Sequence, residues 1–141
     1  MQTIYTIDAS VYVSAFSPDE VAHGASMRFL EQVASAGIPV IVPLLLLPEV
    51  GGTAARKNGD SRAAIRLVDT IVGLPGHRFV PLSRAIADLA VDVAAGSKLR
   101  GSDAVYAAVA LRYATTLVTL DHQQRERVAD LVTTLTPQQA T

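Results

Sequence analysis

Short runs of β-branched and aliphatic residues alternate along the chain with longer stretches in which apolar residues recur at helical spacing. The short runs predict five strands, at residues 3–7, 38–42, 77–82, 116–120 and 132–135. Strands separated by helices pair side by side in a mainly parallel sheet, whose faces the helices cover. The pattern therefore predicts an α/β fold built on a sheet of about five strands.

One of the predicted helices is apolar nearly all round. It covers residues 104–114, where alanine recurs between larger apolar side chains. A helix that is hydrophobic on every side is a buried one, and small alanine side chains let neighbouring backbones approach closely. We therefore expect this helix at the centre of the fold, with Asp103 at its N-terminal end.

The composition narrows the possible classes of protein. A length of 141 residues matches one domain, which we expect to span residues 1–141 with a frayed polar tail at 136–141. The absence of cysteine excludes disulfide scaffolds, thiolate zinc sites and thiol catalysis. The apolar stretch at 38–47 is too short to cross a bilayer, and residues 1–10 do not resemble a signal peptide, so we expect a cytoplasmic protein. The net charge of -1 gives no reason by itself to expect a nucleic-acid partner.

Four carboxylates lie where a parallel sheet gathers functional groups, which is outside the carboxyl ends of its strands. Asp8 and Asp121 each end a predicted strand. Glu49 lies on the segment after the second strand, and Asp103 opens the buried helix. Carboxylates brought together repel one another and need a cation, and an all-oxygen set favours magnesium or manganese over zinc. The sequence therefore predicts a metal site formed by these four acids.

Each acid taken alone also has a purely structural interpretation. Asp8 and Asp121 can cap the helices that follow them, because a side-chain oxygen accepts hydrogen bonds from the unpaired N–H groups of a first turn. Glu49 and Asp103 can act as first-turn acids that interact favourably with a helix dipole. Capping does not explain why four acids recur at the ends of apolar elements, and both interpretations stay open at this point.

Four segments, in order and spread over almost the whole chain, carry a family resemblance. They are IDASV at 7–11, LPEV at 47–50 followed by AARK at 54–57, GSDAVYAAVA at 101–110, and LVTLD at 117–121. Together they resemble the PIN-domain proteins, most closely the VapC-like toxins of bacterial toxin–antitoxin pairs. Pro48 before Glu49 and Gly51-Gly52 after it depart from the continuous helix that is usual there.

The resemblance implies a three-layer α/β/α sandwich and a divalent-metal-dependent endoribonuclease that hydrolyses RNA phosphodiester bonds. The catalytic and metal-binding acids that it implies are Asp8, Glu49, Asp103 and Asp121. It also implies a homodimer and an antitoxin protein as partners. The apolar run at residues 44–47 gives the dimer some independent support, because one helix face of a small domain needs fewer apolar residues.

Two hydroxyl residues beside the acids extend the predicted site. Ser10 follows Asp8 by two residues, and Thr119 precedes Asp121 by two. Either hydroxyl can orient a carboxylate or bind a water molecule held by a metal. A local turn explains Ser10 equally well.

Basic residues near the acids suggest a path for RNA. The densest group follows Glu49 and comprises Arg56, Lys57, Arg62 and Arg66. A smaller pair, Lys98 and Arg100, precedes Asp103. We expect the first group to contact the RNA backbone, although a solvated helix face with Arg66 paired to Asp69 explains it equally well.

Two other functions fit parts of the pattern. A PIN fold that binds RNA or a protein partner without cutting differs from an enzyme only in the lack of metal-dependent cleavage. A phosphoacceptor receiver domain is the other α/β alternative, but it carries two acids after its first strand and a lysine after a late one. Here Asp8 stands alone and Asp121 takes the place of that lysine, so we expect an enzyme.

Overall fold

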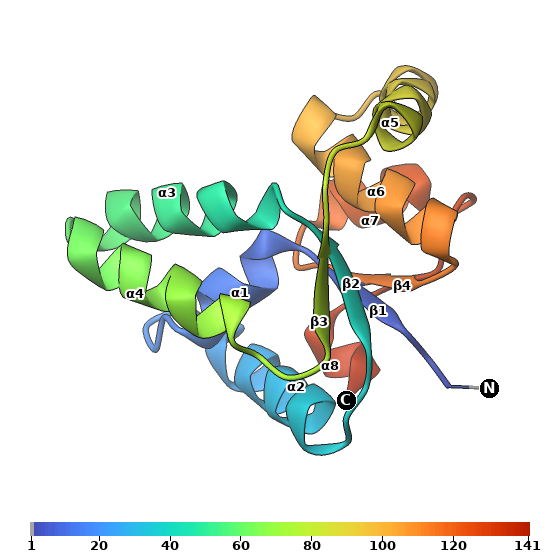
Figure 1. Cartoon of the computed structure of the whole chain (residues 1–141). Helices are drawn as coiled ribbons and strands as arrows, with labels where there is room; N and C mark the ends of the chain where they lie inside the picture. The colour runs from blue at the N-terminus through green and yellow to red at the C-terminus, as the bar shows by residue number, and fades with distance from the viewer. Residues whose placement is uncertain (1) are drawn as a thin grey trace.

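The computed structural model describes residues 2–141 and contains one parallel sheet of five strands, as the alternation predicted (Figure 1). The strands are β1 (Tyr5–Ile7), β2 (Val40–Pro43), β3 (His77–Val80), β4 (Thr116–Val118) and β5 (Thr134–Leu135). Their order is β3-β2-β1-β4-β5, which puts β1 at the centre between β2 and β4. Tyr5 pairs with Val40 of β2 and with Thr116 of β4, so the three central strands end at the same edge.

Helices cover both faces of the sheet. They are α1 (Ala9–Ala15), α2 (His23–Ser35), α3 (Leu46–Asn58), α4 (Ser61–Val72), α5 (Arg84–Ser97), α6 (Gly101–Tyr113), α7 (His122–Val128) and α8 (Pro137–Ala140). Figure 1 shows α5, α6 and α7 on one side of the sheet and α1, α2 and α8 on the other, with α3 and α4 extending as a pair beside α1. The predicted three-layer α/β/α sandwich is confirmed.

The predicted buried helix is α6. Every residue from 104 to 110 is buried, and the helix packs against β1, β2 and β4 on one side and α5 on the other. Its first turn lies at the edge where the central strands end. This placement brings Asp103 to the same edge as the residues that follow β1 and β4.

Helix α3 is continuous through the two features that departed from the family pattern. Pro48 lies in the first turn of α3, where backbone N–H groups have no acceptor within the helix. The N–H that proline lacks is therefore not missed, and the residue costs little stability there. Gly51 faces α4, and a Cβ atom there would lie 3.4 Å from Val68 Cγ2. Glycine thus lets the two helices pack closely, and Glu49 keeps a fixed place in the first turn.

The end of the chain differs from the frayed tail that we expected. Residues Pro137–Ala140 form α8, because Thr136 and Gln139 make a reciprocal capping box and Pro137 has the backbone angle that a first turn requires. The strands are also slightly shorter than predicted, because β1, β2 and β5 begin two residues later and β3 and β4 end two residues earlier. No helix within residues 2–141 combines the length and apolar character needed to cross a membrane.

Candidate active site

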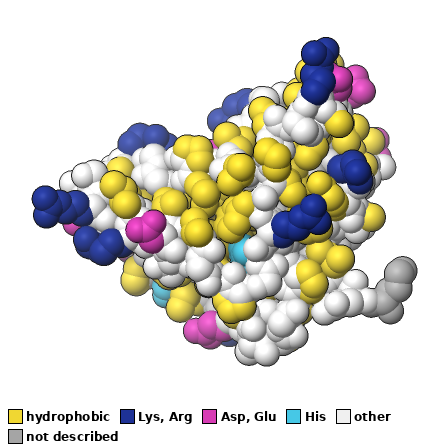
Figure 2. All heavy atoms as spheres, viewed as in Figure 1, with side chains coloured by type: hydrophobic (Ala, Val, Ile, Leu, Met, Phe, Trp, Pro, Cys, Tyr) yellow, Lys and Arg dark blue, Asp and Glu magenta, His cyan; other side chains and the backbone are white. Residues whose placement is uncertain are grey.

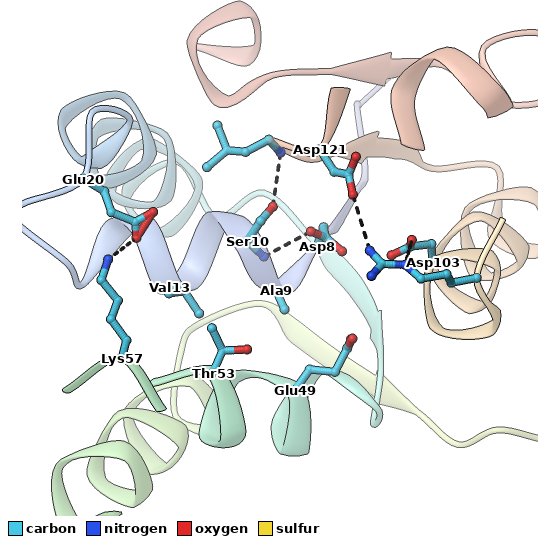
Figure 3. Close-up of a pocket in the computed structure, with 12 residues that line it drawn as sticks. Asp8, Ala9, Ser10, Val13, Glu20, Glu49, Thr53, Lys57, Asp103 and Asp121 are labelled. Carbon is cyan, nitrogen blue, oxygen red and sulfur yellow. Dashed lines mark hydrogen bonds and ion pairs between the residues drawn. The ribbon is translucent and has the colours of Figure 1, made fainter. Parts of the chain in front are cut away.

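The four predicted acids line one open pocket at the carboxyl edge of the sheet, and its volume is about 610 Å³. Asp8 follows β1, Asp121 follows β4, and Glu49 and Asp103 lie in the first turns of α3 and α6. Figure 3 shows the four side chains around the same opening, together with Ser10, Thr53 and Lys57. The fold therefore brings together acids that are up to 113 residues apart in the sequence.

Asp8 is the most buried of the four, with 8% of its surface exposed. It caps α1, because its Oδ2 accepts a hydrogen bond from the Ser10 N–H at 3.1 Å and lies 3.2 Å from the Thr119 hydroxyl. Its Oδ1 accepts no hydrogen bond from residues 2–141 and remains available to a ligand. Burial raises the pKa of Asp8, and the nearby charge of Asp103 raises it further.

Glu49 is held by a buried tyrosine that the sequence did not reveal. The hydroxyl of Tyr106, one turn after Asp103 on α6, donates to Glu49 Oε1 at 2.6 Å. Burial raises the pKa of Glu49, and the charges of Asp8 and Asp103 raise it further, while the Tyr106 hydrogen bond opposes the rise. Tyr106 is fully buried, so this contact fixes the direction in which Glu49 points.

Asp103 and Asp121 share one cation. Arg100 Nε donates to Asp103 Oδ2 at 3.3 Å, and Arg100 Nη2 lies 3.9 Å from Asp121 Oδ2 (Figure 3). Burial raises the pKa of Asp103 and the charge of Asp121 adds to the rise, whereas the Arg100 guanidinium opposes it. Asp121 also caps α7, because its Oδ1 accepts a hydrogen bond from the Gln124 N–H.

Thr119 and Ser10 connect the ends of β1 and β4, as their places beside the acids suggested. The Thr119 hydroxyl accepts from the Asp121 N–H at 3.0 Å, and the Ser10 hydroxyl accepts from the Leu120 N–H at 3.2 Å. Thr119 has a single proton, which it donates either to Asp8 or to the carbonyl oxygen of Gln124. These hydroxyls therefore set the positions of the two aspartates that follow the strands.

Gln124 is a further residue of the site that the sequence analysis missed. It is 1% exposed, and besides its contact with Thr119 its Nε2 donates to the backbone oxygen of Asp103 at 3.2 Å. It thereby ties α7 to the first turn of α6. The spacing Asp121-x-x-Gln124 is typical of a helix start, and this was the available signal.

The donor set fits a hard divalent cation, because four carboxylates converge and at least three of them are disfavoured in their charged form. In the arrangement described, no three acid or histidine side chains among residues 2–141 meet closely enough to hold an ion. Arg100 lies against Asp103 and Asp121 instead. The chemistry of the four carboxylates nevertheless fits magnesium or manganese.

The predicted basic group is divided by the fold. Lys57 lines the pocket, but its Nζ lies 2.6 Å from Glu20 Oε2 and 3.7 Å from Asp19 Oδ1. Arg56 donates to Thr53 on its own helix at 3.2 Å. Three members do not line the pocket, and these are Arg56 on α3 and Arg62 and Arg66 on α4. The Arg66–Asp69 pair that we considered is absent from the ion pairs of residues 2–141.

Comparison with known proteins agrees with this geometry. The family model of the PIN domain matches residues 5–130. The chain belongs to the PIN domain family. The expected family is therefore confirmed, and the receiver-domain alternative is wrong. The search of curated proteins gives no match.

Solved structures with the same fold include proteins of toxin–antitoxin systems. VapC20 of Mycobacterium tuberculosis, described as a sarcin–ricin loop cleaving toxin, is 17% identical with a TM-score of 0.73 over 86% of this chain and 93% of that one. VapBC2 of Rickettsia felis, bound to a promoter DNA fragment, is 14% identical with a TM-score of 0.73 over 95% and 98%. FitAcB of Neisseria gonorrhoeae is 19% identical with a TM-score of 0.73 over 94% and 97%. At these identities the likeness concerns the fold of this PIN domain.

Proposed function

We propose that this PIN domain is a divalent-metal-dependent endoribonuclease that hydrolyses RNA phosphodiester bonds, and that it is the toxin of a toxin–antitoxin pair. The observation that carries the proposal is the convergence of Asp8, Glu49, Asp103 and Asp121 in one pocket at the edge of the sheet. Support also comes from the M. tuberculosis neighbour, which is described as a sarcin–ricin loop cleaving toxin.

The four acids would hold magnesium or manganese. A bound ion supplies positive charge beside the scissile phosphate and makes water easier to deprotonate. The protein's own contribution is to hold the donors in place before the substrate arrives. Tyr106 directs Glu49, and the Ser10 N–H and Thr119 fix Oδ2 of Asp8 so that Oδ1 faces the pocket.

Cleavage of a panel of RNAs tests this function. The purified protein is incubated with structured and single-stranded RNAs in magnesium and, separately, in EDTA, with Asp8→Asn as the control. We expect products only in magnesium and none from Asp8→Asn. RNA binding without cleavage products in any metal would refute the enzyme and support a PIN-fold module that binds RNA. Products in EDTA would refute the metal dependence.

We also propose that the protein forms a homodimer and binds an antitoxin protein in the cytoplasm. Figure 2 shows hydrophobic side chains spread over the face between the α3–α4 pair and α5. An apolar groove lies next to α5, where Leu82 is 60% exposed, Val91 is 64% exposed and Leu45 forms part of the wall. Such surface is usually covered by a partner. The apolar run at 44–47, from which a dimer was predicted, is only partly available to a partner, because Leu44 is exposed but Leu46 is fully buried.

Light scattering at micromolar concentration tests the dimer, and a monomeric mass would count against it. The matched variants Leu82→Ser and Val91→Ser change exposed side chains, so we expect them to weaken the dimer without unfolding the protein. The antitoxin is supported by the toxin–antitoxin complexes among the neighbours, and copurification with the product of an adjacent gene tests it.

A further inference from the structure

Two cations line the acid pocket, and their partners differ. Lys57 is paired with Glu20 and Asp19, which lie outside the group of four acids. Arg100 is paired only with site acids, at 3.3 Å from Asp103 and 3.9 Å from Asp121. Among residues 2–141, Arg100 is thus the cation that contacts the proposed metal ligands directly.

We propose that Arg100 is an exchangeable cation of this site, a role that rests on the proposed function. In the metal-free protein it balances the charges of Asp103 and Asp121. When the divalent ion binds, Arg100 releases both carboxylates and binds a phosphate oxygen of the RNA. The same side chain therefore competes with the metal and assists the substrate.

The contacts of Arg100 are suited to exchange. Its side chain is 79% exposed, and its two contacts go to two different carboxylates instead of forming a bidentate pair with one. Ion pairs as exposed as this contribute little stability, so an ion of higher charge replaces them easily. The side chains of Asp103 and Asp121 are only 15% and 32% exposed, and they stay in the pocket when Arg100 leaves.

The released guanidinium remains at the pocket. Arg100 caps α6 with its backbone immediately before the turn that carries Asp103, so its Cα is fixed at the rim of the pocket. A planar guanidinium has five N–H donors in a fork that matches phosphate geometry. Lys57 could reach a phosphate only by leaving Glu20, which it contacts at 2.6 Å.

Metal binding without RNA tests the first half of the proposal. Isothermal titration calorimetry with manganese chloride compares the parent protein with Arg100→Gln and Arg100→Lys. We expect Arg100→Gln to bind the metal roughly twofold to tenfold more tightly, because the competing pairs are gone. The matched control is Arg84→Gln, since Arg84 is an exposed arginine paired with Asp88 outside the pocket. Unchanged metal affinity in Arg100→Gln would mean that Arg100 does not affect the acids, and weaker affinity would mean that Arg100 organises them for the metal. Either result would refute the proposal that Arg100 competes with the metal.

RNA affinity tests the second half. It is measured at saturating metal as the KM for an RNA that the parent cleaves, or by fluorescence anisotropy if the parent binds RNA without cutting. We expect Arg100→Gln to weaken RNA binding roughly tenfold, as one charge-assisted phosphate contact is lost, and Arg100→Lys to recover part of the loss. A purely structural role would not raise metal affinity while lowering RNA affinity.

The two readouts separate this proposal from the proposed function. If the parent neither cuts nor binds RNA, the ribonuclease function and the phosphate role of Arg100 both fail, while calorimetry still decides whether Arg100 competes with the metal. If the parent cuts RNA and Arg100→Gln has an unchanged KM, the phosphate role alone is refuted.

Discussion

Replacing Tyr106 by phenylalanine tests whether Glu49 must be held in place. The change removes one hydroxyl and keeps a ring that is fully buried, so the packing of α6 against the sheet is preserved. What is lost is the 2.6 Å hydrogen bond to Glu49 Oε1. The substitution therefore separates the position of the carboxylate from the integrity of the core.

The expected magnitudes follow from that single contact. A hydrogen bond to a charged group contributes about 1.5–3 kcal/mol. Glu49 borders an open pocket where water can replace the hydroxyl, so we expect a loss of about 1–2 kcal/mol, or roughly 3–8 °C in Tm for a chain of this length. If a similar free energy is lost from the transition state, kcat falls by about tenfold.

Tyr12→Phe provides the matched control. Tyr12 is also a fully buried tyrosine, and its hydroxyl forms a 2.6 Å hydrogen bond with His77 Nε2 and none with the four acids. We expect a comparable loss of Tm in thermal denaturation but an unchanged kcat on RNA. The reasoning is refuted if Tyr106→Phe cuts RNA as fast as the parent, or if Tyr12→Phe loses activity to the same extent.

The remaining predictions concern charge. In the absence of metal, Asp8→Asn should have a higher Tm than the parent, because burial disfavours the charged carboxylate. Magnesium should raise the Tm of the parent and leave that of Asp8→Asn unchanged, and differential scanning fluorimetry measures both effects. Lys57 lines the pocket, so Lys57→Ala should make RNA affinity less dependent on salt. The slope of log affinity against log salt concentration should change by about 0.7 for one lost phosphate contact. Arg62→Ala should leave the slope unchanged, because Arg62 does not line the pocket. Burial lowers the pKa of His77 below its usual value of 6.5. The neutral ring therefore contributes its full stability above pH 6.5, and this stability is lost as the pH falls through the folded-state pKa. Urea unfolding at pH 7.5 and 5.5 should show a larger loss for the parent than for His77→Gln.

The sheet and the four acids could be predicted because both depend on short-range pattern. Strand runs followed by Asp8 and Asp121 are visible in the sequence, and parallel pairing then dictates that the strand ends meet. The apolar character of residues 104–110 likewise identified the central helix. The tail at 136–141 was predicted wrongly because its polar residues at a chain end suggested fraying, whereas the capping box of Thr136 stabilises a helical turn.

The supporting residues could not be predicted because their roles arise only from tertiary packing. Tyr106 contacts Glu49 across 57 positions, and its place in an apolar run gave no reason to assign it to the site. Arg100 was visible as a basic residue, but its contact with Asp121 exists only because α6 packs against β4. The basic group after Glu49 was divided because α3 and α4 turn its members in different directions.

Capping and metal binding, which the sequence left as alternatives, use different oxygens of the same side chains. Asp8 accepts the cap hydrogen bond on Oδ2 and leaves Oδ1 to the pocket, while Asp121 caps through Oδ1 and directs Oδ2 towards Arg100. Each cap holds its carboxylate against the repulsion of the other acids before any cation arrives. The two roles can be separated, because Asp8→Asn keeps an acceptor for the Ser10 N–H whereas Asp8→Ala does not. Both substitutions should abolish metal binding, but only Asp8→Ala should lose the cap contribution of about 1 kcal/mol. A helix cap is therefore the device by which this fold orients Asp8 and Asp121, two of the four acids proposed to be catalytic.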